Sequence, residues 1–543
     1  MHANRQEIYW DKHVFSALSG GRSSSSNRKI IIYAIIGIVA VAGVSATFLA
    51  GGTEPAPGPQ PSQQDSIARF KAQFCGPDSK ANSNTYIAEA VLPSECQMPL
   101  SVSVDGDGRV WYVSTKQGIL GSYSIADNKF AQYQIPQWPA RDKPTDFNMS
   151  WATKTDSQGN VWFTDNNELL WRFNTAASTF DMFRTPATDP ISFDFDSDGN
   201  IYLVGVRSKS LFFGDLSQMK PGTAEGFTEI RLPLDGFAGI DNFRVSSGSV
   251  TVDRERNVVW TSVLAFQQKG AIYRYDVERN QTSVYDLPQE LTSPVGLTVD
   301  RDGNLWGTDH GTSIFFTLNP SDGKVTEYTT SVASPRIYGG TTTPASAYTL
   351  PYWIATAPDG RIWFNQHEGN KISVFDRDTR TLTEYWVPSQ NELWANCPDN
   401  ANTCGLANAL QMSVGPQGQV WFTEWSENKI GRVNTDAQAP FTVSAPDDVN
   451  VRRGDSMEIK VDINAQGAFS GRMVASGTFT YNGDLGNSTG IFSEQDVSIP
   501  AGDSKQVSFV FTPGNIAAGQ YTLMLGAEND EVSVLKAVTV NVV

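Results

Sequence analysis

The stretch APDGRIWFNQHEGNKISVFD, residues 357–376, followed by LTEYWVP at 382–388, decides the fold. It contains an Asp-Gly turn, a short strand with a central aromatic residue, a second turn and two more alternating strands. Six other stretches repeat the first turn and the aromatic strand: DGDGRVWYVS (105–114), DSQGNVWFTD (156–165), DSDGNIYLVG (196–205), DRERNVVWTS (253–262), DRDGNLWGTD (300–309) and GPQGQVWFTE (415–424). Repetition at this spacing indicates that one supersecondary unit recurs along the chain.

Four short antiparallel strands per repeat are typical of the blade of a β-propeller. Seven repeats therefore predict seven blades within residues 67–437, with six or eight as alternatives because the third repeat is the least regular. The seventh repeat stops after its third strand, whereas a matching fourth-strand sequence, TYIAEAVLP, occurs early in the chain at 85–93. We expect this strand to complete the last blade, which would pair both ends of the ring and leave no open edge there.

The repeat is absent from residues 441–543, where strands alternate as in a β-sandwich. Tyr521, which follows a Gly-Gln turn, is similar to the tyrosine of the tyrosine corner in immunoglobulin-like domains. The segment contains no histidine or cysteine, so we expect a spacing or adhesion role rather than chemistry. The predicted fold class is all-β, with a seven-bladed propeller and a C-terminal immunoglobulin-like β-sandwich.

An uncharged apolar run, IIIYAIIGIVAVAGVSATFLA, occupies residues 30–50 and is long enough to cross a bilayer as one helix. Basic residues precede the run and none follows it closely, which predicts a cytoplasmic tail at 1–29 and an extracytoplasmic body after residue 50. Residues 51–66 are rich in proline and read as a solvated linker. We therefore expect a single-pass membrane protein.

The net charge of −17 argues against a nucleic-acid partner, whose phosphates need a basic surface. An extracytoplasmic location would permit disulfides between the four cysteines. The pairs closest in sequence are the simplest of three connectivities: Cys75 with Cys96, and Cys397 with Cys404. Three sequons are compatible with surface glycosylation, at Asn148, Asn280 and Asn487.

His310 and His367 occupy the same repeat position, directly after the aromatic strands of the fifth and sixth repeats. The aromatic strand is expected near the propeller axis, so these histidines should line one pocket at the channel mouth. Three acidic residues are expected beside them: Asp309, Glu368 and Glu424. Neutral imidazole can act as a general base, or can bind a divalent cation together with carboxylates. The alternative is that the repeat tolerates any polar residue there, as Asp165 of the second repeat suggests.

The stretches DSQGNVWFTDNN, APDGRIWFNQHEGNKISVFD and GPQGQVWFTEWSENKIGRVN resemble repeats of the streptogramin B lyase (virginiamycin B lyase) family, and the resemblance covers about residues 85–437. It implies a seven-bladed propeller that linearises a cyclic depsipeptide by magnesium-dependent elimination across an ester. The matching base candidates are His367 and His310, and the matching metal ligands are Glu424 or Glu368, with Asp309 beside them. Mg²⁺ is the preferred metal, and Ca²⁺ or Zn²⁺ are alternatives.

Two functions remain open on the sequence alone. The first is a membrane-anchored carbon-oxygen lyase acting on a cyclic ester or depsipeptide. The second is a non-catalytic binding or sensing propeller of NHL type that recognises a peptide or glycan. A lactonase-type propeller ranks third because the sequence offers no clear calcium-binding set. The expected partners are the membrane, through residues 30–50, and a small-molecule or peptide ligand at the channel mouth.

Overall fold

The computed structural model describes residues 62–76, 80–237, 240, 244–265, 268–332, 348–391, 406–480, 489–514 and 516–543. The chain divides into two compact units, Met1–Gly58 and Pro59–Val543, and all described residues belong to the second. The expected tail (1–29), the expected membrane span (30–50), Cys397, Cys404 and Asn487 lie outside the described residues. Within the described part of the chain, no helix is long and apolar enough to cross a membrane.

Helix α3 (Gln63–Phe74) begins inside the segment 51–66, which the sequence predicted to be a solvated linker throughout. The prediction is wrong at its C-terminal end because Ser62 and Asp65 form a capping box. The Ser62 hydroxyl accepts from the Asp65 amide, and the Asp65 carboxylate accepts from the Ser62 amide. Reciprocal capping of this kind satisfies two free donors and starts a helix.

The other elements are strands, and their bounds follow the predicted repeats. The first sheet contains β2 (Pro99–Val104), β3 (Val110–Ser114), β4 (Ile119–Ser124) and β5 (Lys129–Gln134). The second contains β6 (Thr153–Thr155), β7 (Val161–Asp165), β8 (Leu169–Asn174) and β9 (Thr179–Arg184). The third contains β10 (Pro190–Phe195), β11 (Ile201–Gly205), β12 (Ser210–Gly214) and β13 (Phe227–Arg231), and the 3₁₀ turn η2 (Asp235–Phe237) follows it.

The fourth sheet contains β14 (Val245–Asp253), β15 (Val258–Ala265), β16 (Ala271–Asp276) and β17 (Gln281–Asp286). The fifth contains β18 (Pro294–Val299), β19 (Leu305–Asp309), β20 (Ile314–Leu318) and β21 (Val325–Thr329). The same meander recurs in β22 (Pro351–Thr356), β23 (Ile362–Gln366), β24 (Lys371–Asp376) and β25 (Thr381–Trp386), which we call the sixth sheet. The seventh sheet joins β26 (Met412–Val414), β27 (Val420–Glu424) and β28 (Lys429–Val433) to β1 (Ile87–Val91).

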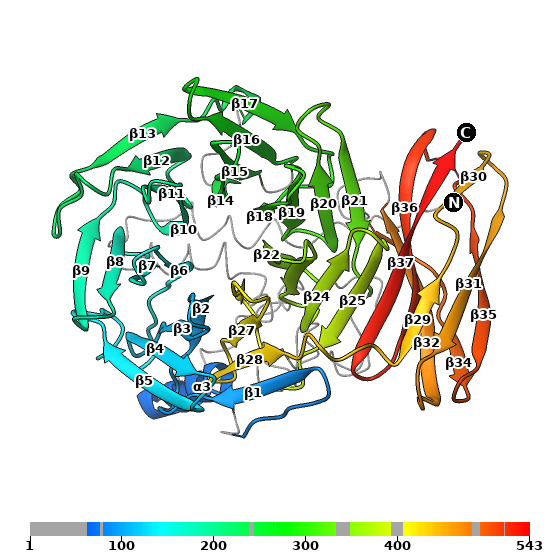
Figure 1. Ribbon diagram of the computed structural model, residues 1–543, viewed down its shortest axis with the longest axis horizontal. Helices are drawn as coiled ribbons and strands as arrows, with labels where there is room; N and C mark the ends of the chain where they lie inside the picture. Colours follow the sequence, from blue (N-terminus) through cyan, green and yellow to red (C-terminus); the bar gives the residue numbers. More distant parts are fainter. Residues whose placement is uncertain are drawn as a thin grey trace, which may run out of the picture. The chain divides into compact units, whose positions relative to one another are not determined.

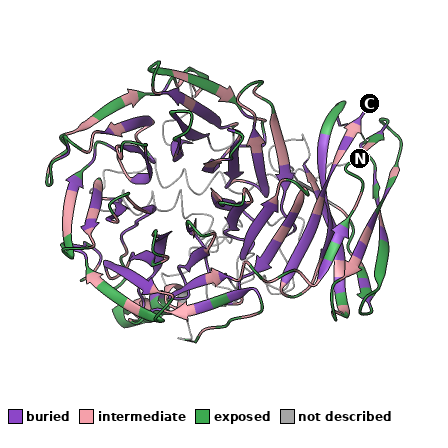
Figure 2. Ribbon diagram, viewed as in Figure 1, coloured by how far each residue is buried: buried purple, intermediate pink, exposed green. Residues whose placement is uncertain are grey.

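These sheets lie around a ring in a β-propeller arrangement, so the predicted all-β class is confirmed (Figure 1). The first strand of each sheet lies nearest the centre, and these inner strands contact one another around the ring, including β22 with β26 and β26 with β2. The aromatic second strand, expected near the axis, lies directly beside this innermost strand. Burial follows the same order, since the inner strands are buried and the outer strands β5, β13 and β17 are largely exposed (Figure 2).

In the first, second and fifth repeats, the turn aspartate and the tryptophan six residues later form one structural unit. The Trp162 indole donates to the Asp156 carboxylate at 2.8 Å, and the same aspartate accepts two backbone amides of its turn. Trp306 makes the matching bond to Asp300 at 2.9 Å. A turn that also anchors the buried indole explains why these residue types recur six positions apart.

Strand β1 pairs antiparallel with β28, with Ile87 opposite Val433 and Val91 opposite Lys429. The Lys429 ammonium lies 3.2 Å from the Glu89 carboxylate, and neither side chain is exposed. Glu89 also accepts hydrogen bonds from the Ser389 amide and hydroxyl. The N-terminal strand is thus held in the last sheet by a ladder and by a buried ion pair.

The C-terminal strands form two sheets rather than a detached domain. A three-stranded sheet contains β29 (Phe441–Ser444), β31 (Met457–Ala465) and β35 (Ser504–Phe511). The other strands are β30 (Asp448–Val451), β32 (Gly471–Thr480), β33 (Thr489–Ile491), β34 (Gln495–Ile499), β36 (Gly519–Glu528) and β37 (Val532–Val542). Strand β37 pairs with β25 from Thr381 opposite Lys536 to Tyr385 opposite Val532, which makes one ten-stranded sheet. The outer edge of the sixth sheet is thereby covered.

Replacing Lys429 by methionine should lower the free energy of unfolding by about 3–5 kcal/mol, because Glu89 would remain buried without its counter-charge. Urea denaturation of the full chain measures this change. The control Lys220→Met breaks an exposed pair with Glu225 and should cost about 0–1 kcal/mol. Equal stability of Lys429→Met and the wild type would contradict a stabilising role for this pair.

Candidate functional site

His310 and His367 each follow the second strand of a sheet, β19 in the fifth and β23 in the sixth. Each backbone amide donates to the loop that enters the first strand of its sheet, His310 to the Ser293 carbonyl at 2.8 Å and His367 to the Leu350 carbonyl at 3.0 Å. The two imidazole rings consequently lie side by side, with centroids 5.4 Å apart and planes inclined by 13°. The structure thus brings together the two histidines that the sequence singled out.

Aromatic side chains surround this pair. His310 stacks on Tyr352 of the inner strand β22, with ring centroids 4.2 Å apart. Tyr352 also meets the edge of Trp151, at 6.2 Å, and lies 5.6 Å from Trp353. Trp151 precedes the second sheet, so its contact with Tyr352 joins the second sheet to the sixth. The histidines are 9% and 2% exposed, so both side chains are buried in this cluster.

Several polar atoms of this cluster make no hydrogen bond of ordinary geometry within the described part of the chain. They are both ring nitrogens of His310, Nδ1 of His367, the Tyr352 hydroxyl and the Trp353 indole nitrogen. A buried donor or acceptor without a partner costs about 1–3 kcal/mol. The cluster therefore gains free energy from any bound molecule that offers complementary polar groups and an apolar face.

Burial keeps both imidazoles neutral. It lowers the pKa of His367 to about 4, against the opposing effect of its hydrogen bond with Asn408. Burial, and after it the neighbouring His367, lowers the pKa of His310 well below its usual value. At neutral pH the pair carries no charge, so it can offer lone pairs and N–H groups but no cation.

Asp309 does not face the histidines, although it precedes His310 directly. Consecutive residues of a strand point to opposite sides, and the Asp309 carboxylate instead accepts from the Ser293 amide, the Gly311 amide and the Thr312 hydroxyl. Burial raises its pKa to about 7, against those hydrogen bonds. Asp309 acts as a turn anchor, which corrects its expected place among metal ligands.

On the side of the strands that Asp309 faces, the sixth sheet and the seventh sheet each contain a buried ion pair, and the two pairs occupy equivalent positions. Lys371 meets Glu384 at 3.3 Å, and Lys429 meets Glu89 at 3.2 Å. In both sheets the lysine opens the third strand, and the glutamate lies on the fourth strand opposite the residue two positions further along. The repeat thus places a carboxylate and an ammonium together inside each of these sheets.

The fifth sheet lacks this lysine. Ile314 opens β20, while Glu327 retains the glutamate position opposite Phe316. Glu327 instead shares a hydrogen bond with the Glu290 carboxyl group, which requires a proton on one of them. Burial, followed by Glu290 and Asp309, raises the pKa of Glu327 well above its usual value.

Glu424 is also separated from the histidines. It ends β27 in register with Lys429, and burial and the nearby Glu89 raise its pKa well above the usual value. The position equivalent to His310 and His367 is held by Trp425, whose indole donates to the Thr115 hydroxyl at 3.0 Å. The sequence predicted that Glu424 would lie beside both histidines. This is wrong, because the equivalent position is one residue later in the chain, at Trp425.

Glu368 follows His367 and is 6% exposed, and burial raises its pKa well above the usual value. The resemblance noted above implies a magnesium ion held by such carboxylates. Among the residues that the structure describes, however, no group of three or more His, Cys, Asp or Glu side chains is arranged to hold a metal ion. We therefore assign the implied metal no ligand among the described residues.

Cys75 and Cys96 form a disulfide, the first of the two pairs expected from sequence spacing. The sequons differ in accessibility. Asn148 is 4% exposed and its amide nitrogen donates to Asp165 at 2.9 Å, so it does not offer this nitrogen to a glycan. Asn280 is exposed at the turn between β16 and β17, with its amide oxygen held by the Tyr275 hydroxyl.

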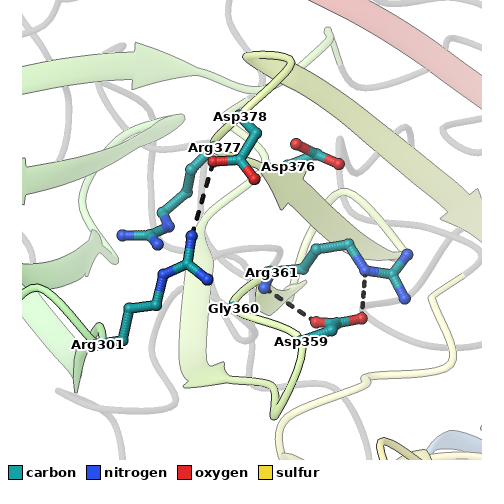
Figure 3. Close-up of a pocket in the computed structure, with 7 residues that line it drawn as sticks. All are labelled: Arg301, Asp359, Gly360, Arg361, Asp376, Arg377 and Asp378. Atoms are coloured by element: carbon teal, nitrogen blue, oxygen red, sulfur yellow. Dashed lines mark hydrogen bonds and ion pairs between the residues drawn. The ribbon is translucent and has the colours of Figure 1, made fainter.

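Two hollows of the described structure lie away from the histidines. A pocket of about 230 Å³ is lined by arginines and aspartates of turns in the fifth and sixth sheets (Figure 3). Arg361 bonds Asp359 at 2.7 Å, and Arg377 bridges to Asp302 of the neighbouring sheet at 3.0 Å. A groove of about 830 Å³ lies between the third and fourth sheets. The acids in the small pocket neutralise its arginines, so it reads as an ion-pair network between sheets.

Sequence reasoning missed Tyr352 and Asn408. Tyr352 lies on a first strand, outside the aromatic motif that defined the repeats. Asn408 lies just before β26, as Leu350 lies just before β22. The two positions are equivalent because the Asn408 carbonyl accepts from the Trp425 amide, and the Leu350 carbonyl accepts from the His367 amide. Alignment of the loops before the first strands would have placed Asn408 beside the histidines.

No protein-family model matches the chain, and no curated protein matches it. Among solved structures, virginiamycin B lyase from Staphylococcus aureus is similar at 18% identity and a TM-score of 0.48, over 64% of this chain and 98% of that one. A streptogramin B lyase structure is similar at 21% identity and a TM-score of 0.49, over 64% and 97%. The extracellular domain of the hybrid two-component system BT4673 from B. thetaiotaomicron is similar at 12% identity and a TM-score of 0.40, over 82% and 57%. The fold described here rests on the strand pairings, and the site on its own contacts.

Replacing Glu327 by glutamine should flatten the pH dependence of stability. A raised pKa in the folded state stabilises the chain below the unfolded pKa, and this contribution is lost as pH rises through the folded pKa. The wild type should therefore lose more free energy of unfolding between pH 5 and pH 8 than Glu327→Gln, as measured by urea denaturation. Glu229→Gln, at the same repeat position in the third sheet but half exposed, is the matched control and should keep the wild-type slope. If the free energy of unfolding changes with pH equally in the wild type and in Glu327→Gln, Glu327 and Glu290 do not share a proton.

Proposed function

We propose that the chain is a ligand-binding seven-bladed β-propeller whose binding site is the cluster of His310, Tyr352 and His367. One observation carries this proposal: a buried, uncharged aromatic cluster holds several polar atoms that make no hydrogen bond of ordinary geometry within the described part of the chain. Sites for small molecules combine mostly apolar walls with a few fixed polar groups. A neutral ligand with a rigid apolar face and N–H, O–H or carbonyl groups, such as a cyclic peptide or cyclic ester, fits this chemistry.

The wider architecture belongs to the same proposal. The sixth sheet repeats the meander of the six separate sheets, which supports seven blades. An immunoglobulin-like identity for the C-terminal β-sandwich is supported by the Tyr521 hydroxyl, which donates to the Ala517 carbonyl four residues upstream at 2.9 Å. The Cys75–Cys96 disulfide supports an extracytoplasmic body, because oxidising compartments preserve such bonds. Attachment to a membrane through residues 30–50 completes the proposal.

A second candidate function is a carbon-oxygen lyase acting on a cyclic ester. It is favoured by the Nδ1 atom of His367, which accepts no hydrogen bond from any residue that the structure describes. In such an elimination the imidazole would take a proton from the carbon next to the carbonyl. The released electron pair would form a carbon-carbon double bond as the ester carbon-oxygen bond breaks, with the carboxylate leaving. A buried imidazole with a pKa of about 4 is fully deprotonated at neutral pH but is a weak base, so binding is the function that the geometry supports better. No step is assigned to a metal, and a divalent ion remains a prediction from the sequence.

The full chain should be tested for binding and turnover of cyclic depsipeptides of the streptogramin B class and of simple lactones, with and without Mg²⁺. Calorimetry measures binding. Liquid chromatography separates the opened isomer that elimination gives from the intact ring, which has the same mass, and mass spectrometry identifies hydrolysis, which adds one water. Binding without turnover is expected, and it should weaken at least about tenfold, or about 1.4 kcal/mol, in His367→Ala and Tyr352→Phe. Lys220→Met, in the exposed pair with Glu225, is the control and should bind as the wild type does.

Turnover that is lost in His367→Ala would establish the lyase as the function instead. Equal affinity of His367→Ala, Tyr352→Phe and wild type for every compound that binds would remove the histidine cluster as the binding site. Binding that is lost only in variants of the groove between the third and fourth sheets would move the site there.

A further inference from the structure

A chain of hydrogen bonds runs from His367 into the loop before the seventh sheet. The Nε2 atom of His367 lies 2.8 Å from the Asn408 side-chain oxygen. The Asn408 amide nitrogen donates to the Ser426 hydroxyl at 3.1 Å, and that hydroxyl donates to the Leu406 carbonyl at 3.0 Å. All four residues are buried, so water does not compete for these groups.

The Leu406 carbonyl, which is the last acceptor, fixes the direction of every hydrogen bond in this series. A carbonyl oxygen cannot donate, so the single hydroxyl hydrogen of Ser426 is used on Leu406. The Ser426 oxygen must then accept, which turns the NH₂ group of Asn408 toward it and the amide oxygen toward His367. This argument decides the amide orientation from the network and does not depend on telling nitrogen from oxygen in the side chain.

An amide oxygen at 2.8 Å requires a hydrogen on Nε2 of His367. Because the ring is neutral in its buried setting, the other nitrogen, Nδ1, then carries a lone pair and no hydrogen. Nδ1 makes no hydrogen bond within the described part of the chain. The ring is also held by the parallel ring of His310, so both its plane and its tautomer are set by the protein.

We propose that Asn408 and Ser426 are positioning residues that hold His367 as the Nε2–H tautomer and thereby present Nδ1 as the acceptor of the site. This inference rests on the function proposed above and deepens it, because the group of the ligand that meets His367 must then be a hydrogen-bond donor. For a binding site that group is an N–H or O–H of a cyclic peptide or ester. For an elimination it is the acidic C–H next to a carbonyl. Asn408 suits its place, since its φ of 53° lies in the left-handed region that asparagine tolerates.

The full chain labelled with ¹⁵N-histidine tests this without any ligand, because nitrogen shifts separate hydrogen-bearing from bare ring nitrogens. Only four histidines contribute, and the His367→Gln spectrum identifies the resonances of interest. At pH 7 the wild type should show a bare Nδ1 and a hydrogen-bearing Nε2 for His367. One hydrogen bond of ordinary strength shifts a tautomer ratio about tenfold, so Asn408→Gly should move both resonances toward a mixture. Ser426→Ala should do so in part, and Ser426→Thr should restore the wild-type spectrum.

A hydrogen on Nδ1 in the wild type, or the same tautomer in wild type, Asn408→Gly and Ser426→Ala, would overturn the inference. Thermal unfolding of each variant shows whether it is folded, and Ser426→Ala keeps the test decisive if Asn408→Gly is not. Failure of the proposed function looks different, because the tautomer would follow this pattern while no ligand bound. Where a ligand does bind, Asn408→Gly should weaken its binding, whereas the control Lys220→Met should bind it as tightly as the wild type does.

Discussion

Strand β1 lies against β28, and its Glu89 carboxylate meets the Lys429 ammonium where neither side chain reaches solvent. A ring of twisted sheets has a first and a last member, and their contact decides whether the inner strands can all pack at once. Here β26 packs against both β22 and β2, and β1 gives the sheet of β26 its fourth strand. Without β1 the edge of β28 would be open and the buried lysine would lose its partner. The disulfide Cys75–Cys96 ties the chain on both sides of β1.

The ring has a functional consequence because equivalent positions of consecutive sheets lie side by side. His310 and His367 meet for this reason, and the intervening inner strand adds Tyr352 between the sheets. Successive side chains of a strand point to opposite sides. The histidines therefore point toward the axis, whereas Asp309 and Glu424 point into buried polar clusters within the sheets. One repeat thus builds two layers, an uncharged aromatic layer near the axis and an ionic layer within the sheets.

The sequence predicted the repeats, the N-terminal strand of the last sheet and the histidine pair well, because each depends on a pattern within one repeat. Turn aspartates bind buried indoles six residues later, and this bond is visible as a spacing. Contacts between repeats left no such pattern. Nothing in a single strand showed whether Glu424 or Trp425 would share the histidine layer, since one residue of register separates them.

Two further features depend on partners far apart in sequence. The pairing of β25 with β37 joins the propeller to the C-terminal strands, yet every sheet of the ring offers an outer edge and no local signal chooses the sixth. Asn408 reaches His367 from a loop that carries no repeat motif. Such choices are made by tertiary packing and long-range hydrogen bonds, which neither periodicity nor residue type reveals.

Native-state hydrogen exchange of the intact chain tests most directly whether the ring is closed by β1. The account predicts that the amides of β1 exchange as slowly as those of β28, and that both open only with the ring as a whole. Exchange in β1 as fast as in an exposed terminal segment, with β28 still protected, would contradict closure by this strand.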